Sequence, residues 1–398
     1  MESSTPEFGA PDFGVAMTRL AAKLEAVADD GAIGRRQLLQ AGIGSLIALG
    51  VPHAFAADPA PDEALVAAAR KEGTLTIYTP SEIDMMVNWC ASFTQSYGVQ
   101  VKAVRGPGYP MFDRWLNEER VGRHFADVIQ TSDPTLFDTA STHGFLATYK
   151  PAADPSIYPG MKRSGVWYAL HVGYMGIGYN TNRIVGDDEQ FIHAHGWDAL
   201  ADPRWHGRCA TTAAASGGST YAYDFMFMVG LKDRYGEAFL RKWAANKPEI
   251  YISKPPLFDR LAAGQYAIAD EATAADLESL YLKGAPVRWV FPDPTPAILT
   301  SQGISAHAPH PNAARLFSEW SLSVPGQTAW LKYESSGPTR PDVVDPRKAN
   351  KRDWFAEPWY TEPKTLYLDY LTDPAFADPA KPLIAAWNAI FGYGDAAQ

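Results

Sequence analysis

The stretch from residue 73 to residue 104, GTLTIYTPSEIDMMVNWCASFTQSYGVQVKAV, decides the fold class of this chain. Residues 75–78 form a short run of strand-forming side chains that ends at Thr-Pro-Ser, which is typical of a strand before a loop. Residues 85–97 have apolar side chains with helical spacing. These side chains are Met86, Trp89, Cys90 and Phe93. A glycine follows, and residues 99–104 alternate again. The stretch therefore predicts a strand, a helix and a second strand.

The same pattern continues downstream. Residues 112–121 present one apolar helical face, and residues 126–129 form a third predicted strand. Strands that alternate with helices indicate a mainly parallel sheet that is covered by helices on both faces. The fold class is therefore α/β.

A long extended segment interrupts this pattern after residue 165. Residues 167–179 are punctuated by glycines and suit a connector that passes between two lobes. A second α/β region follows. Its strands are predicted at 208–212, 266–269 and 287–291, and its helices at 219–230, 235–247 and 257–263. Residues 292–296 are a candidate for a second crossover, after which helix 312–322 rests on a sheet again.

The first 56 residues carry the features of an export signal. Arg35 and Arg36 precede an apolar run over residues 41–51, and an Ala-x-Ala pattern ends at Ala56. The paired arginines are typical of a twin-arginine signal, and the run is too short and glycine-rich to span a bilayer. We expect cleavage after Ala56 and a periplasmic protein. The alternatives are a buried N-terminal helix and a true start at Met17.

Charge and cysteine content exclude several classes of protein. The 398 residues carry a formal net charge of -10, whereas a general nucleic-acid binder needs a basic face.

Cys90 and Cys209 cannot form a disulfide framework. We expect two buried free thiols, with a single disulfide as the alternative in an oxidising compartment. The histidines show no metal-binding spacing, so we expect neither a metal site nor a cofactor.

Short stretches spread along the chain carry a family resemblance. They are KEG at 71–73, residues 118–129 and 173–181, WDALADPRWHG at 197–207, LAAGQ at 261–265, GAPV at 284–287 and PHPNAARLFSEWSLSVPGQ at 309–327. In their order and spacing the chain resembles the extracellular solute-binding proteins of ABC importers. That family includes receptors for ferric iron, phosphonates, sugar phosphates, polyamines and thiamine.

The resemblance implies the two-lobed type II periplasmic-binding fold, with two extended hinge crossovers. Lobe 1 would comprise residues 57–172 and 296–398, the latter with the C-terminal helices, and lobe 2 residues 173–295. The resemblance also implies a monomer that binds one solute between the lobes and delivers it to a membrane permease, without catalysis. An enzyme of the same fold is the distant alternative. Cys90 has core spacing, Cys209 lies at a strand start, and no catalytic motif is present.

Ligands of open α/β sheets bind beyond the carboxyl ends of the strands. Polar side chains and glycines after four predicted strands are therefore candidate solute contacts. They are Ser81, Glu82, Tyr109, Ser132, Asp133, Ser216, Gly218, Ser219, Thr220 and Tyr221. Tyr174 on the first connector and Glu271 after strand 266–269 complete the predicted site. Glu271 would suit an amine or sugar hydroxyls, or would simply be part of a solvated helix start.

Residues 217–219, Gly-Gly-Ser, open a predicted helix whose N-terminus favours an anion, because its N–H groups are free and the dipole is positive there. The hydroxyls of Ser219 and Thr220 would add donors, although a plain N-cap is the alternative. With the resemblance, this favours a phosphonate, a sugar phosphate or a carboxylate as the solute.

Tyr221 and Tyr223 weigh against bare ferric iron. Side chains at i and i+2 of a helix point about 200° apart, so the two rings cannot easily face one metal. Tyr221 would contact the solute and Tyr223 would pack. Ferric iron, thiamine and polyamines stay as alternative solutes of the same family.

Overall fold

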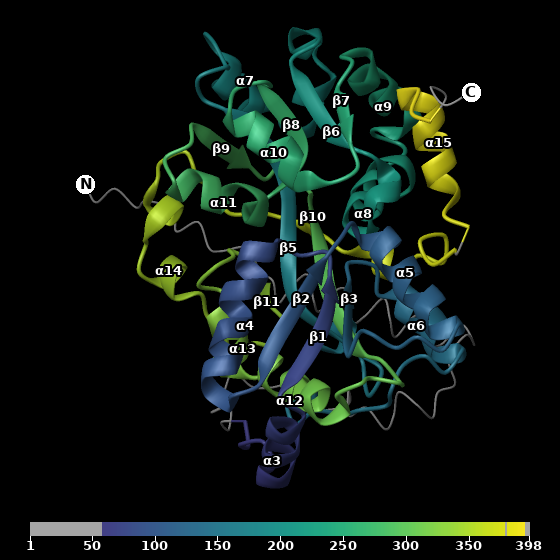
Figure 1. Cartoon of the computed structure of the whole chain (residues 1–398). Helices are drawn as coiled ribbons and strands as arrows, with labels where there is room; N and C mark the ends of the chain where they lie inside the picture. The colour runs from purple at the N-terminus through teal and green to yellow at the C-terminus, as the bar shows by residue number, and fades with distance from the viewer. Residues whose placement is uncertain (1–57, 379, 395–398) are drawn as a thin grey trace, which may run out of the picture.

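The computed structural model describes residues 58–378 and 380–394. Two groups of α/β elements lie one above the other and share two long central strands (Figure 1). The predicted export signal and the cleavage position after Ala56 lie outside the described residues. Within the described residues, no helix combines the length and the hydropathy of a membrane span.

The lower group in Figure 1, which we call lobe 1, begins with the three predicted parallel strands. β1 (Thr74–Thr79) pairs with β2 (Gln100–Arg105) on one side and with β3 (Val128–Thr131) on the other. The helices between them are α4 (Ile83–Tyr97) and α5 (Gly108–Arg120), as the periodicity predicted. Other helices of lobe 1 are α3 (Glu63–Glu72), α6 (Thr135–Thr142), α12 (Pro311–Ser321) and α13 (Val324–Trp330).

The apolar face of α4 holds the early and late parts of lobe 1 together. Trp89 and Phe93 are buried, and the Trp89 ring lies 5.3 Å from that of Phe317 in α12. The indole N–H of Trp89 also donates to the Gly326 carbonyl in α13 at 2.9 Å. Gly98 ends α4 with φ 76°, a left-handed conformation that suits glycine. The sequence periodicity therefore predicted the buried face correctly.

Two long strands cross between the lobes. β5 (Trp167–Asn180) pairs with β10 (Thr295–Ile304) along its first part, and with β8 (Ile268–Thr273) and β9 (Val287–Val290) along its second. The first predicted connector is confirmed as this continuous strand. The second crossing is longer than residues 292–296, because the chain continues through β10 into the lobe 1 sheet. The resulting strand order is β2-β1-β3-β10-β5-β8-β6-β7.

Lobe 2 is the upper group in Figure 1. β6 (Cys209–Thr212) pairs in parallel with β8 and with β7 (Glu249–Tyr251). Its helices are α7 (Asp188–His195), α8 (Gly218–Phe225), α9 (Gly236–Ala245), α10 (Lys254–Ala262) and α11 (Ala274–Leu282). The helix predicted over 219–230 changes to a π-turn at Met226–Gly230, where the Leu231 N–H bonds to the Met226 carbonyl.

The C-terminal part of the chain returns to lobe 2. β12 (Leu366–Tyr367) pairs with the start of β10, and α15 (Pro382–Phe391) packs beside α9 and α8 (Figure 1). Trp387 of α15 and Phe376 before it are buried with the aromatic side chains of α8. The sequence prediction did not anticipate this packing, and its residue boundaries for the lobes stay a prediction.

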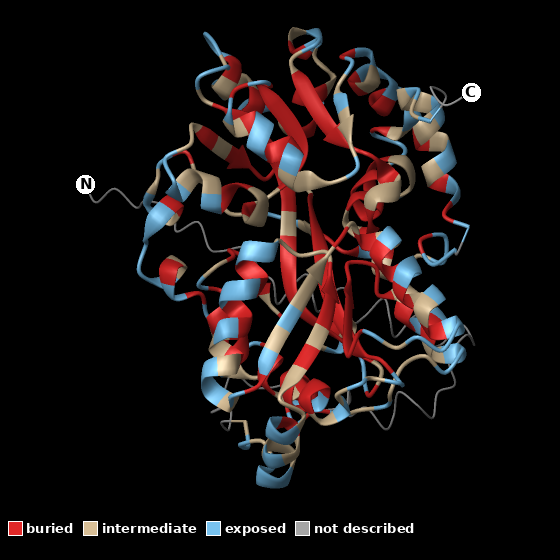
Figure 2. Cartoon of the chain, viewed as in Figure 1, coloured by how far each residue is buried: buried red, intermediate tan, exposed pale blue. Residues whose placement is uncertain are grey.

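Burial is concentrated on the central strands and on the inner faces of the helices, as Figure 2 shows in red. Cys90 lies in the lobe 1 core and Cys209 in the lobe 2 core, and both are unpaired and buried. The expectation of two buried free thiols is confirmed.

Candidate functional site

Two hydrogen bonds join the lobes directly. Arg105, at the end of β2, donates from Nη1 to Oγ of Ser253, which precedes α10, at 2.7 Å. The backbone N–H of Ser219, in the first turn of α8, donates to Oγ of Ser132 after β3 at 2.9 Å. The structure therefore shows the lobes in a closed arrangement.

Glycines allow the backbones of the two lobes to touch at one point. We call this point the glycine junction, and it comprises Gly108, Ser132 and Asp133 of lobe 1 and Gly217 and Gly218 of lobe 2. A Cβ atom on Gly108 would lie 3.2 Å from the Gly217 Cα. A Cβ atom on Gly218 would lie 2.5 Å from the Asp133 Cβ. Glycine at these positions therefore permits the close approach of the backbone of the opposite lobe.

Asp133 is the charged group of the glycine junction. Its buried carboxylate accepts a hydrogen bond from the Tyr109 hydroxyl at 3.0 Å. It also lies 2.7 Å from Nζ of Lys381, a residue of the C-terminal segment. That Nζ lies 4.8 Å from the centroid of the Tyr221 ring, a cation–π distance.

The fold thus gathers six of the predicted site residues at the glycine junction: Tyr109, Ser132, Asp133, Gly218, Ser219 and Tyr221. Ser216 and Thr220 lie beside them and share a 3.0 Å hydrogen bond between their hydroxyls. The Ser219 N–H of α8 does face lobe 1, but Ser132 already accepts it. The anion site at this helix stays a prediction.

The two tyrosines of α8 have different surroundings. The Tyr221 ring lies 5.4 Å from that of Phe376 in the C-terminal segment. The Tyr223 hydroxyl donates to Asp270 at 3.3 Å, and its ring packs on Trp197 in lobe 2. Tyr223 therefore packs inside lobe 2, as predicted. The expectation that the two tyrosines do not share a metal stays a prediction.

A second group of charged residues meets between the lobes, and we call it the acidic junction: Glu82, Arg105, Lys254, Glu271, Asp276 and Glu334. Thr79 at the end of β1 pairs with Arg105 at the end of β2, which brings Glu82 within 3.3 Å of the guanidinium. From lobe 2, Nζ of Lys254 lies 3.8 Å from Asp276 and donates to the Glu271 carbonyl at 2.7 Å. Glu82, Glu271 and Asp276 therefore share these two cationic side chains.

Glu334 completes the acidic junction from the segment after α13. Its buried carboxylate lies 3.4 Å from Nδ1 of His171 on β5. The His171 ring stacks on Trp330 at 4.4 Å, and burial lowers the pKa of this histidine to about 3. Because His171 is held neutral, it does not balance the charge of Glu334.

The pKa values report the electrostatic cost of this arrangement. Burial, with a smaller effect of Asp276, raises the pKa of Glu82 to about 7. Burial and then Asp270 raise the pKa of Glu271 well above its ordinary value. Burial also raises that of Glu334, with further effects from neighbouring carboxylates. A cation placed here would stabilise all three ionised forms.

Glu271 combines several unusual features. It is buried, and neither of its carboxylate oxygens has a hydrogen-bond partner within the described part of the chain. Its φ of 55° is uncommon for a residue with a side chain. The sequence placed Glu271 after a strand, which is wrong. It lies inside β8, because the pairing of β5 with β8 shifts between Gly176 and Gly178 and accommodates the irregular residue.

The two remaining predicted residues lie at the edge of these groups. Tyr174 of β5 has its ring 6.1 Å from that of Phe291 and its hydroxyl against Gly337. Ser81 is partly exposed, and its N–H donates to the Thr79 hydroxyl in the turn before α4. Their roles as solute contacts stay predictions.

Sequence reasoning missed several residues that the fold brings to these groups. Ser253, Glu334 and Lys381 follow no recognisable motif, and each meets its partner through long-range packing. Asp276 belongs to a capping box with Thr273 at the start of α11, which is a local pattern, but its contact with Lys254 depends on packing. The expectation of no metal site stays a prediction, although the fold brings one group of possible ligands together. Glu119, His124 and His307 place one possible ligand atom each within 4.8 Å of one another.

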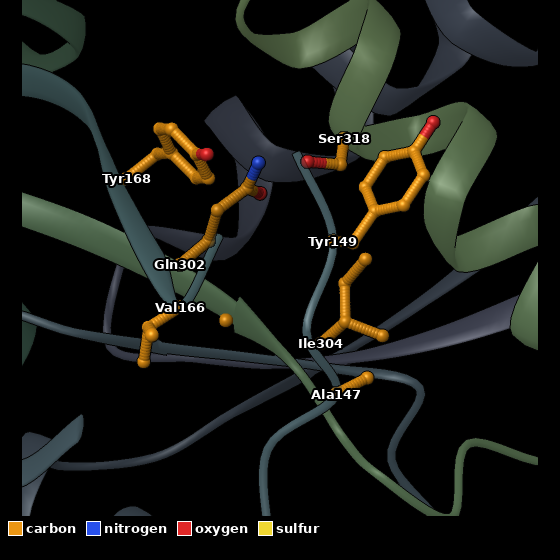
Figure 3. A pocket seen from close by; sticks show the side chains of 8 residues that line it. Ala147, Tyr149, Val166, Tyr168, Gln302, Ile304 and Ser318 are labelled. Carbon is orange, nitrogen blue, oxygen red and sulfur yellow. The ribbon is translucent and has the colours of Figure 1, made fainter. Parts of the chain in front are cut away.

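A small pocket lies elsewhere, in lobe 1 (Figure 3). Tyr149, Tyr168, Gln302 and Ser318 line it together with apolar side chains such as Ile304. Its space suits no more than about one water molecule, so it is not a candidate for binding a larger solute.

Comparison with known proteins identifies the relatives of the chain. The model of a family described as bacterial extracellular solute-binding protein matches residues 123–346, which is more than half of the chain. No curated protein sequence matches it significantly.

Solved structures match the fold. One is the periplasmic binding protein AfuA from Actinobacillus pleuropneumoniae with fructose-6-phosphate bound, at a TM-score of 0.65, 21% identity and coverage of 80% of this chain and 99% of that one. Another is the substrate-binding protein of an ABC transporter from Agrobacterium tumefaciens, with a TM-score of 0.65 and 17% identity. This match covers 80% of this chain and 94% of that one. A third is iron-bound HitA from Pseudomonas aeruginosa, with a TM-score of 0.61 and 20% identity. This match covers 80% of this chain and 99% of that one. The TM-scores establish a shared fold.

Proposed function

The chain belongs to the bacterial extracellular solute-binding proteins, and from that premise we propose that it is an ABC-importer receptor whose lobes close around one small organic cation. The receptor would be exported to the periplasm by the twin-arginine route and would act there as a monomer. Its closed form would dock on a membrane permease, and no bond of the solute would be made or broken.

The excess of carboxylates in the acidic junction carries this proposal. Glu82 comes from lobe 1 and Asp276 from lobe 2, so closure brings these two carboxylates together. Glu271 is already destabilised within lobe 2 by Asp270. Arg105 and Lys254 balance only part of that charge. A cationic solute would interact more favourably with the closed state than with the open one, and this difference is what shifts the population toward closure.

The chemistry of the acidic junction favours an ammonium group over a bare metal ion. Phe291, which follows β9, groups with two other rings, since it lies 6.1 Å from Tyr174 and 6.4 Å from Tyr360. Aromatic faces attract organic cations as well as their apolar chains. The solute class that fits best is therefore an aliphatic or aromatic amine, such as a polyamine or thiamine.

An anionic solute is the second candidate. Lys381 lies beside the start of α8, where the helix N-terminus would add to its positive potential. The fold is also shared with a protein solved with fructose-6-phosphate bound. Asp133 lies at the same place, however, and already pairs with this lysine.

A ligand screen on the purified protein tests the proposal. Thermal-shift and calorimetric titrations would compare spermidine, putrescine and thiamine with fructose-6-phosphate, a phosphonate, citrate and ferric iron. We expect amines to bind stoichiometrically and without turnover, and Glu271→Gln to weaken binding. Glu237→Gln, which changes an exposed carboxylate of α9, is the control. Binding of anions alone would refute the solute class, and steady turnover of a bound compound would refute the receptor.

A further inference from the structure

Three potential metal ligands converge at the end of the lobe 1 sheet that lies away from the acidic junction. Glu119 lies near the end of α5, His124 in the loop before β3, and His307 in the loop after β10. The end of β10 pairs with the start of β3, Ile304 opposite Val128, so these loops are neighbours. Ser132 and Asp133 leave the other end of β3 toward lobe 2. The cluster is therefore separate from the proposed solute site.

The possible ligand atoms of the three side chains already lie close together. Oε2 of Glu119 lies 2.9 Å from Nδ1 of His124 and 3.0 Å from Nδ1 of His307. The two imidazole rings stack at 4.4 Å. Donor atoms around a tetrahedral zinc ion are separated by about 3.3 Å when each ligand bond is about 2.0–2.1 Å. Small movements of the two imidazoles would therefore admit an ion.

The surroundings hold the carboxylate in place. The other oxygen of Glu119 accepts a 2.8 Å hydrogen bond from the Ser305 hydroxyl, and the Ser305 N–H is itself held by the Asp127 carbonyl. Gly122, with φ 70°, ends α5 and turns the chain so that His124 comes back over the helix end. A carboxylate that binds a metal is usually held by such an outer hydrogen bond, and Ser305 would supply it here.

The charge balance of the cluster also favours a cation. The Glu119 side chain is fully buried, and within the described residues only histidines lie at ion-pair distance from it. A buried carboxylate needs a compensating cation or full hydrogen bonding. The side chains of His124 and His307 are 28% and 54% exposed, so an ion has a path to the carboxylate and the fourth position would be open to water.

We propose that Glu119, His124 and His307 form a binding site for one zinc-class divalent metal ion in lobe 1. Two imidazoles and one carboxylate are ligands that zinc prefers, and they leave one position free. Because the ligands come from three separate segments, the ion would cross-link the end of α5 with the loops beside β3 and β10. A bound ion would stabilise lobe 1 in proportion to its affinity.

Metal titration of the tag-free, chelator-treated protein tests this proposal. Zn²⁺ affinity would be measured by competition with a chromophoric chelator, and the coordination by the visible absorption of bound Co²⁺. We expect one ion per chain, a raised unfolding temperature, loss of binding in His307→Gln, and affinity about tenfold lower in Ser305→Ala. His310→Gln, which changes a histidine bonded to Asp127 nearby, should bind as the unchanged protein does.

Two results would overturn the site. One is the absence of Zn²⁺ binding to the unchanged protein. The other is equal binding by the unchanged protein and by the double variant His124→Gln/His307→Gln. Both replaced side chains are partly exposed, so circular dichroism should show this variant to be folded. Solute binding provides an independent check that this variant is folded, because neither histidine belongs to the acidic junction.

Discussion

Arg105 of lobe 1 donates a hydrogen bond to Ser253 of lobe 2 across 2.7 Å, and the same guanidinium lies 3.3 Å from Glu82. One side chain therefore links the closure of the lobes to the charge state of the acidic junction. A solute that neutralises Glu82 would also leave Arg105 free to hold the lobe 2 hydroxyl.

Ser253→Ala should shift the protein toward the open state. The variant removes the neutral partner of a charged donor, and such bonds contribute about 1.5–3 kcal/mol. Solute affinity should fall by about tenfold or more, while the unfolding temperature of the unliganded protein changes little. Calorimetry and small-angle scattering measure the two effects. Ser96→Ala, which changes an exposed hydroxyl on α4, is the matched control. Unchanged affinity would show that this bond plays no part in closure.

Gly218→Ala should block closure by steric overlap. Its Cβ atom would lie 2.5 Å from the Asp133 Cβ and 2.6 Å from the Asp133 nitrogen, and neither atom is at the end of a flexible side chain. The lobes must then separate, so the radius of gyration with solute should stay at the open value. In the control Gly173→Ala of β5, the added Cβ atom would lie 3.9 Å from the Ile298 carbonyl oxygen of β10, which is an ordinary contact. Normal compaction of the Gly218 variant would contradict the closed arrangement.

The pH dependence of stability and of solute affinity should reveal the titration of Glu82. Its pKa in the folded protein is about 7, above the ordinary 4.5, so the folded state retains a proton that the unfolded chain releases. The stability that this neutral carboxyl contributes is complete below pH 4.5 and is lost as the pH rises to about 7. Affinity for a cationic solute should change in the opposite sense and increase over the same interval.

The Glu82→Gln variant separates these effects. Denaturant unfolding at several pH values should show a smaller decline in stability between pH 4.5 and 7 than in the unchanged protein. Titration of an amine across the same range should show a weaker increase in affinity. A decline in stability identical to that of the unchanged protein would mean that another group titrates there.

Local patterns predicted much of the fold and part of the candidate site. The spacing of Trp89 and Phe93 predicted the buried face of α4, and the offset of Tyr221 from Tyr223 predicted that they have different surroundings. These predictions succeeded because helix geometry fixes the direction of each side chain. Strand ends also placed Ser132 and Ser219 correctly at the meeting point of the lobes.

Features that depend on long-range packing were not predictable in the same way. Glu271 lies in an irregular part of β8, and no residue pattern marks a register shift with the neighbouring strand. Lys381 reaches Asp133 only because the C-terminal segment returns to the junction after crossing lobe 2. His124 and His307 meet because β3 and β10 are paired, although the two residues are far apart in the sequence.

Lys381 and Asp133 should behave as a coupled pair. Asp133 is buried and the Lys381 side chain is 8% exposed, so replacing the lysine leaves a buried carboxylate without its cation. Such a loss destabilises proteins by about 3–5 kcal/mol, whereas removal of both charges is much less harmful. Lys381→Met should therefore lower the free energy of unfolding strongly, and Asp133→Asn/Lys381→Met should recover most of it. Denaturant unfolding of the four proteins in this double-mutant cycle measures the coupling. Additive effects would show that the C-terminal segment is held at the glycine junction by apolar contacts alone, such as that of Phe376 with Tyr221.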